Sequence, residues 1–177
     1  VINVELVKGK TKVISINVNY SATKPDAKSV LDIIQGNGNF QKANEAALRA
    51  NLQSVRNAID WYYGDHSSTF PGVKTDGTNN AKTSAAFISQ LLKYSNAVGV
   101  VSDSKDPLFP FGPYLRAGIP NLPVGVNAGK GSVASEITAV DTPGPIAVAE
   151  SVGSGWIYNF QTGEFVANSN DTGSDGE

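Results

Sequence analysis

Residues 41–63 read QKANEAALRANLQSVRNAIDWYY, and this stretch decides the fold. Its large apolar residues recur at alternating spacings of four and three, at Leu48, Leu52, Val55, Ile59 and Tyr62. That spacing places them in one stripe along an α-helix, and the alanines before the stripe favour helix as well. Burying the stripe is worth about 10 kcal/mol before conformational entropy is subtracted. We therefore predict a long helix that ends at Gly64 and lies on an apolar surface formed elsewhere in the chain.

The residues before this helix predict different structure. Apolar and polar residues alternate over residues 1–20 with a break at Lys8-Gly9-Lys10, a pattern typical of a β-hairpin. Pro25 suits the first turn of a short helix that continues to Ile34. The cluster Gly36-Asn37-Gly38-Asn39 is then expected to stop this helix and to act as a hinge or boundary.

The residues after the long helix predict one shorter helix and several strands. Residues 83–95 carry an apolar helical face, and residues 133–140 and 145–152 are expected to be strands joined by a turn at Thr142-Pro143-Gly144-Pro145. Residues 156–160 and 164–167 flank Gln161-Thr162-Gly163 and predict a second hairpin. The fold class we expect is α+β, with the long helix packed on a small antiparallel β-sheet and an extra N-terminal β-hairpin.

The chain is expected to divide into three parts. Residues 1–39 form the hairpin and short helix and act as a docking extension, and residues 40–168 form the main globular domain. Residues 169–177 form a flexible acidic tail rich in Ser, Asn, Asp and Gly.

The composition excludes several classes of partner. The net charge is -2, from 14 basic and 16 acidic residues, and no basic stripe is present, so we expect no nucleic-acid partner. The chain has no cysteine, and no apolar run of about 18 residues that would span a bilayer. The surface should be rich in small polar residues, which suits an exported protein, although compositional drift explains it equally well. Because the sequence has no methionine, we expect a segment removed before Val1.

Little in the sequence indicates catalysis. Asp65-His66-Ser67-Ser68 contains the residue types of a catalytic triad, but such residues meet in space rather than as neighbours on one loop. His66 is the only histidine and follows a helix C-terminus, so we expect a solvated helix end and no enzyme activity. Gly125, Gly129 and Gly131 are spaced loosely like a phosphate-binding loop, but the Lys-Ser/Thr ending is missing, and a flexible loop is expected.

Two sets of acidic residues offer oxygen ligands to a metal. Asp171, Asp175 and Glu177 lie in the tail, and Asp103 and Asp106 lie in an earlier loop. Calcium requires several such oxygens. Two interpretations remain open, a calcium site and a plain acidic tail, and the expectation is no cofactor unless calcium binds.

Five aromatic residues are candidates for contact with another subunit: Trp61, Tyr63, Phe109, Phe111 and Tyr114. Three successive residues of a helix point in different directions, so Trp61 and Tyr63 cannot share the buried face of Tyr62. They either pack beneath the loop at residues 65–80 or the last strands, or they contact a neighbouring subunit, since aromatic residues are enriched at interface cores.

Four segments between Ala43 and Ala167 resemble the globular region of type IV pilins and of type II secretion major pseudopilins. The first is 47–52 with 58–63 and the following Phe70-Pro71, and the second is Gly112-Pro113-Tyr114-Leu115 with Ile119-Pro120 and Pro123. The third is Gly155-Trp156-Ile157-Tyr158-Asn159, and the fourth is Thr162-Gly163-Glu164 with Ala167-Asn168.

The resemblance implies that the helix packs on a small antiparallel sheet and that subunits polymerise into an extracellular filament, either a type IV pilus or a secretion pseudopilus. It also implies an apolar helix in the filament core, and it raises the expectation of calcium in a late loop. Residues 1–39 stand where the family has that apolar helix. Either the chain was trimmed and fused to foreign residues, or it is one half of a split pilin and docks on a separate short hydrophobic helix chain. A secreted adhesin that binds carbohydrate or surfaces, motivated by the aromatic loop at residues 107–123, is the alternative.

Overall fold

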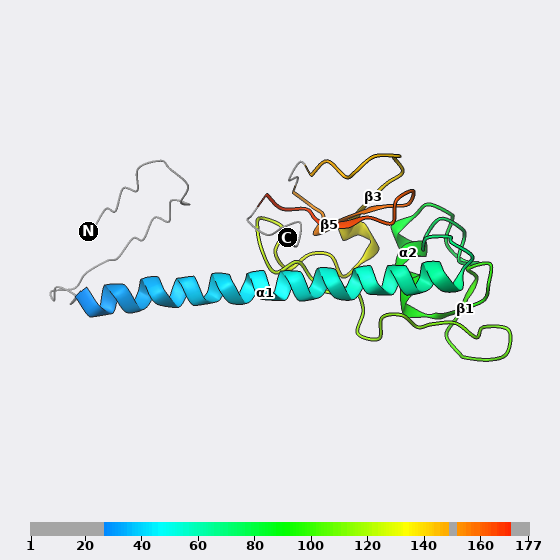
Figure 1. The fold of residues 1–177 in the computed structure, drawn as a ribbon, viewed down its shortest axis with the longest axis horizontal. Helices are drawn as coiled ribbons and strands as arrows, with labels where there is room; N and C mark the ends of the chain where they lie inside the picture. The colour runs from blue at the N-terminus through cyan, green and yellow to red at the C-terminus, as the bar shows by residue number, and fades with distance from the viewer. Residues whose placement is uncertain (1–26, 149–151, 171–177) are drawn as a thin grey trace. The chain divides into compact units, whose positions relative to one another are not determined.

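The computed structural model describes residues 27–148 and 152–170, with side chains described from residue 39 onward. The chain forms two units, Val1–Phe40 and Gln41–Glu177. The expected N-terminal hairpin and the acidic side chains Asp171 and Asp175 lie outside the described residues. What the structure describes is an α+β chain with one long helix and small antiparallel and mixed sheets (Figure 1).

The long helix α1 runs from Ala27 to Asp65. Its apolar stripe is confirmed, since Leu48, Leu52, Val55, Ile59 and Tyr62 are each at most 1% exposed. The expected stop at residues 36–39 is wrong, because the helix continues through it. Gly36 and Gly38, the two glycines of this expected stop, weaken the helix by about 1 kcal/mol each. However, the span from Ala27 to Asp65 contains no proline, which would break the backbone hydrogen bonds of the helix.

The shorter helix α2 spans Ser84–Leu92, close to its predicted position. Thr83 caps it, since its side-chain oxygen accepts a hydrogen bond from the Ala86 amide at 3.2 Å. Two short strands that the sequence did not predict follow directly, β1 (Tyr94–Ser95) and β2 (Val101–Ser102), which pair antiparallel.

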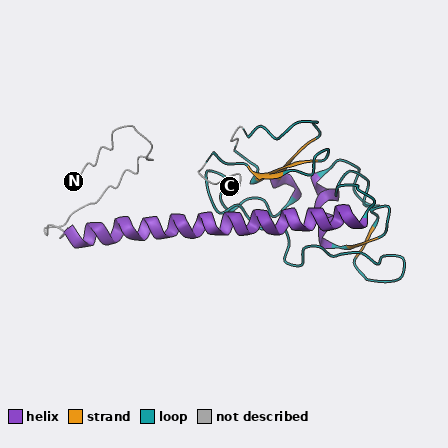
Figure 2. Cartoon of the chain, viewed as in Figure 1, coloured by secondary structure: helices purple, strands orange, loops and turns teal. Residues whose placement is uncertain are grey.

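A three-stranded sheet follows the 3₁₀ turn η1 (Ala134–Glu136), with strand order β3-β4-β5. The strands are drawn in orange in Figure 2. Strands β4 (Trp156–Asn159) and β5 (Phe165–Ala167) pair antiparallel, which confirms the predicted hairpin. Strand β3 (Ile137–Val140) pairs with β4 in parallel, so the expectation of a purely antiparallel sheet is wrong. Residues 145–148, the described part of the expected strand 145–152, are irregular.

The core forms where the C-terminal half of α1 meets this sheet and α2 (Figure 1). The rings of Trp156 and Phe165 stack at 5.1 Å between centroids, and those of Phe87 and Tyr158 stack at 4.0 Å. All four side chains are completely buried. A continuous aromatic layer therefore joins α2 to both strands of the hairpin.

Gly155 permits the close approach of two backbone segments, and replacing it with alanine should destabilise the fold. A Cβ atom at residue 155 would lie 2.2 Å from the carbonyl oxygen of Lys130, which belongs to the backbone and cannot rotate away. We expect Gly155→Ala to lower the free energy of unfolding by about 1–3 kcal/mol, measured by denaturant titration. Gly144→Ala is the matched control, because a Cβ there meets no atom within 4 Å. Equal stabilities of the two variants would contradict the predicted clash.

Candidate functional site

Aromatic rings gather at the C-terminal end of α1. The imidazole of His66 stacks on the ring of Tyr62 with 3.7 Å between centroids and 5° between planes. The ring of Tyr114 meets Tyr62 edge-on at 5.5 Å, and Phe111 lies 5.3 Å from His66. These contacts fix the loop around residues 111–114 against the end of the helix.

His66 is buried, with only 2% of its surface exposed, so the expectation of a solvated helix end is wrong. Its Nδ1–H donates to the carbonyl of Tyr62 at 2.8 Å, and its Nε2 accepts from the hydroxyl of Ser95 at 3.1 Å. Burial lowers the pKa of His66, and the Tyr62 carbonyl opposes this only in part. Burial therefore favours the neutral ring, and the contacts that hold it in place are with the Tyr62 carbonyl and Ser95, not with the neighbouring Ser67 or Ser68.

The burial of His66 predicts a loss of stability in mild acid. Because the pKa is lower in the folded chain than in the unfolded one, the unfolded chain binds more protons below about pH 6.5. The free energy of unfolding should therefore fall as the pH drops from 7.5 through 6.5 toward the folded pKa. His66→Gln should remove this decrease, since His66 is the only histidine. Denaturant titrations of both proteins at pH 7.5 and 5 provide the measurement, and parallel profiles would refute the assignment.

A surface pocket of about 540 Å³ opens beside this cluster. Its lining comes from the last turns of α1 and from the loop that packs on them, and consists of Asp60, Trp61, Gly64, Asp65, Gly112, Pro113 and Tyr114. Trp61 is 61% exposed. The hydroxyl of Tyr114 donates to Oδ2 of Asp65 at 2.9 Å and so orients that carboxylate at the pocket. The pocket thus combines an exposed indole with two carboxylates at a helix C-terminus, an arrangement that favours a cationic ligand.

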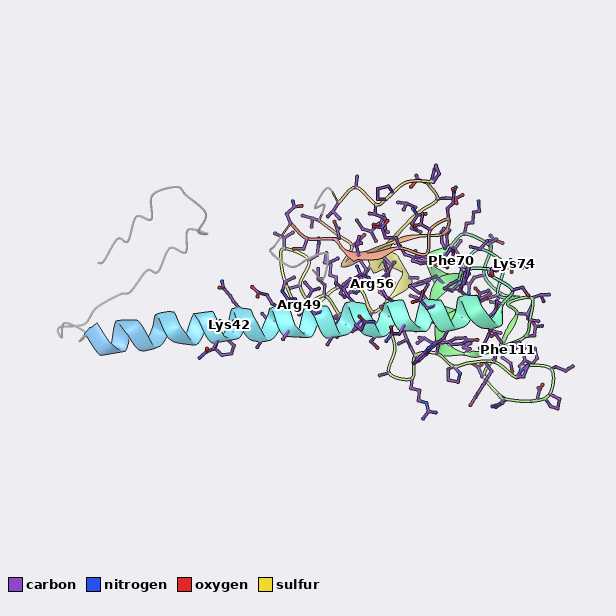
Figure 3. The ribbon with its side chains drawn as sticks, in the orientation of Figure 1. Lys42, Arg49, Arg56, Phe70, Lys74 and Phe111 are labelled. Atoms are coloured by element: carbon purple, nitrogen blue, oxygen red, sulfur yellow. The ribbon has the colours of Figure 1, made fainter. Side chains whose placement is uncertain are left out.

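The structure brings Trp61 and Tyr114 together in this pocket and gives the other aromatic candidates different surroundings. Tyr63 packs on Phe70 with 4.3 Å between ring centroids, whereas Phe111 packs on His66. Phe70 and Phe111 are labelled in Figure 3. Phe109 is half-buried in a turn closed by its own amide and the carbonyl of Asp106 at 3.0 Å. Tyr63 and Phe111 therefore contribute to intramolecular packing, and Trp61 presents the larger exposed aromatic surface.

The structure contains a buried polar network that the sequence patterns did not predict. The carboxylate of Asp76, which is 1% exposed, accepts hydrogen bonds from the amides of Thr78 and Asn79 at 2.8 and 2.5 Å and from the hydroxyl of Ser89. Gln90 accepts from the Gly72 amide at 2.6 Å and donates to the Gly99 carbonyl at 2.8 Å. Asp followed by Gly predicts a turn, but nothing in the sequence shows that this turn is buried against α2.

The described carboxylates considered for calcium have other partners. Asp103 pairs with Nζ of Lys93 at 2.9 Å, and Oδ1 of Asp106 accepts from the amide of Leu108 at 2.7 Å. Among residues 27–148 and 152–170, no three His, Asp or Glu side chains converge to hold a metal ion. The tail candidates Asp171 and Asp175 lie outside the described residues, and calcium binding there stays a prediction from the sequence.

The glycine-rich loop is closed by its own hydrogen bonds. The Gly129 amide donates to the Leu122 carbonyl at 2.8 Å, and the Gly131 amide donates to Oε2 of Glu136 at 2.8 Å. These two amides already donate to acceptors within the chain, and one acceptor is a carboxylate, which would repel a phosphate. The loop therefore does not suit phosphate binding.

A second pocket of about 540 Å³ lies over strands β3 and β4 with an uncharged lining that includes Val140, Pro145 and Ile157.

Comparison with known proteins found no matching family, no similar curated protein and no similar solved structure. In the part of the chain that the structure describes, no helix has the length and apolar character needed to cross a membrane.

Proposed function

We propose that this chain is a structural subunit of an extracellular filament of the type IV pilus or pseudopilus kind. The observation that carries the proposal is the division of α1 into two stretches. From Leu48 to Tyr62 the helix buries one apolar face, whereas residues 39–47 are exposed except for the half-buried Glu45. A helix that packs on a small sheet and also presents an uncovered stretch suits a subunit that assembles through its helix.

Two further features support a structural role. The ring nitrogens of His66 are both engaged in hydrogen bonds that hold the end of α1. The indole of Trp61 is exposed in a surface pocket and is not part of the core, so a partner can reach it. In this proposal each subunit is anchored by an apolar helix, supplied by its own chain or by a separate short hydrophobic chain. Repetition of one heterologous contact then generates a helical filament.

Electron microscopy of the native protein, isolated with any helix chain that accompanies it, tests this proposal. We expect filaments with a regular subunit repeat. Particles that stay monomeric at all protein concentrations, with that helix chain present, would rule out the filament function. Sequencing of the gene upstream of Val1 and of the adjacent reading frame then decides whether the apolar helix belongs to the same chain.

The alternative is a secreted adhesin module, and the pocket beside Trp61 is the observation that favours it. An exposed indole flanked by the carboxylates of Asp60 and Asp65 offers a stacking surface and hydrogen-bond acceptors to a sugar ring. A glycan array followed by titration of Trp61 fluorescence tests this function. Saturable binding that Trp61→Ala abolishes would support the adhesin, whereas an unresponsive array would leave the filament as the proposed role.

A further inference from the structure

Basic and acidic residues both occur along the described side chains of α1, in the order Lys42, Glu45, Arg49, Arg56, Asp60 and Asp65. Lys42 and Arg49 are seven positions apart, about two helical turns, so they lie on the same side of the helix. Both are exposed; Lys42 stands before the packed part of α1, and Arg49 directly follows Leu48, its first buried residue (Figure 3). Asp60 and Asp65 stand at the other end, in the pocket that contains Trp61.

We propose that the pocket beside Trp61 receives Lys42 and Arg49 of a second copy of this chain. The inference rests on the proposed filament function and names the contact that repeats along the filament. A guanidinium or ammonium group over the Trp61 ring gains cation–π attraction, and the two carboxylates add charge attraction at a helix C-terminus.

The chain cannot satisfy this pocket with its own Lys42 and Arg49. Because a helix rises 1.5 Å per residue, these residues lie roughly 16–27 Å from Asp60 along a rigid helix, which is further than either side chain extends. The ion pairs between described residues are Lys82–Asp141 and Lys93–Asp103, and neither involves the pocket carboxylates or the two basic residues. Lys42, Arg49 and Asp60 are exposed, so a second molecule can reach both halves of the proposed contact.

The contact is heterologous, since two basic residues of one copy meet an acidic pocket of the next. Such a contact leaves one unused half at each end of a growing assembly, so it propagates instead of closing into a dimer. It therefore supplies the directionality that a filament requires.

Reversal of the charges on each side tests the contact. Asp60→Lys with Asp65→Lys makes the pocket basic, and Lys42→Glu with Arg49→Glu makes the helix stretch acidic. Each double variant alone should associate at least about tenfold more weakly than the wild-type protein in sedimentation equilibrium, because like charges then meet. An equimolar mixture of the two should recover association, since each unlike pair of molecules restores opposite charges at the contact.

Two variants that keep every charge in place complete the test. Trp61→Ala removes the ring, and Gly64→Gln fills the pocket with a neutral side chain at a position where a Cβ meets no atom within 4 Å. Both should weaken association while leaving thermal unfolding close to that of the wild-type protein. Asp103→Lys, a charge reversal outside the pocket, is the control and should associate normally.

The outcomes separate the contact from the filament function. Filaments that form equally well from wild type, from both charge-reversal variants and from Trp61→Ala would overturn the contact and leave the filament function standing. Charge-dependent association in solution without filaments would support the contact and count against the filament. Association that no variant alters, or a mixture that recovers nothing, would overturn the contact in either case.

Discussion

Replacing Trp156 with alanine should lower the free energy of unfolding by about 3–5 kcal/mol, the cost typical of removing a large buried aromatic side chain. The Trp156 side chain is fully buried and stacks on Phe165, and its indole N–H donates to the Pro120 carbonyl at 2.8 Å. The substitution therefore leaves a cavity beside the hairpin and removes the donor to a carbonyl in the loop. Denaturant titration followed by far-ultraviolet circular dichroism measures the loss.

Trp61→Ala is the matched control for this prediction. The chain has two tryptophans, and Trp61 is 61% exposed whereas Trp156 is 0% exposed. Surface substitutions usually change stability by less than about 0.5 kcal/mol, so Trp61→Ala should unfold close to the wild-type midpoint. Similar losses in the two variants would contradict the burial difference described here.

Replacing Asp76 with asparagine should cost about 2–3 kcal/mol, although the two side chains have nearly the same shape. The ionised carboxylate accepts from the amides of Thr78 and Asn79, from the Asn79 side-chain amide at 2.7 Å and from Ser89. An asparagine side chain has only one acceptor oxygen, so one group of buried donors would meet another donor. Denaturant titration at pH 7 measures the loss.

Asp106→Asn provides the comparison, because Asp106 accepts amide hydrogen bonds from Leu108 and Phe109 in the same turn geometry but is exposed. We expect this variant to lose less than about 0.5 kcal/mol, since water replaces the lost bonds.

The dependence of stability on acid provides a second test of Asp76. Burial raises the pKa of Asp76, but the hydrogen bonds from Ser89, Asn79 and Thr78 outweigh it and the pKa is lowered. The stability that Asp76 contributes is therefore present above its ordinary pKa and is lost as the pH falls through the folded value, and Asp76→Asn should lack this decrease.

The sequence predicted those helices and strands that are determined by patterns of neighbouring residues. The stripe from Leu48 to Tyr62 follows helical periodicity, and Thr83 is a standard cap, so both helices could be found from residue spacing alone. The β4–β5 hairpin was equally accessible, because its strands flank a turn that contains Gly163. The aromatic residues Trp61 and Tyr114 were also recognised as candidates, but their meeting in one pocket depends on a contact between distant segments.

The errors have causes that local patterns do not contain. Residues 145–148 are apolar enough for a strand, but a side chain accepts from the Ile146 amide, and another side chain binds the turn that precedes these residues. Glu164 accepts from the Ile146 amide at 2.7 Å, and Asn159 donates to the carbonyls of Thr142 and Gly144 at 3.0 and 3.1 Å. His66 follows a helix end that is usually solvated, and only the packing of Tyr62 and Ser95 around it shows that it is buried.

The contact between α1 and β5 also determines the order in which this domain can be completed. Nε of Arg56 donates to the Phe165 carbonyl at 3.0 Å, which joins residues 109 positions apart, and the buried face of α1 rests on Phe165 and Ala167 near the end of the described chain. Contacts so distant in sequence form late and slow folding. A chain that emerges N-terminus first, from a ribosome or through a narrow pore, therefore leaves part of the apolar face of α1 uncovered until β5 has emerged. The aromatic core is therefore completed only when the β4–β5 hairpin reaches α1.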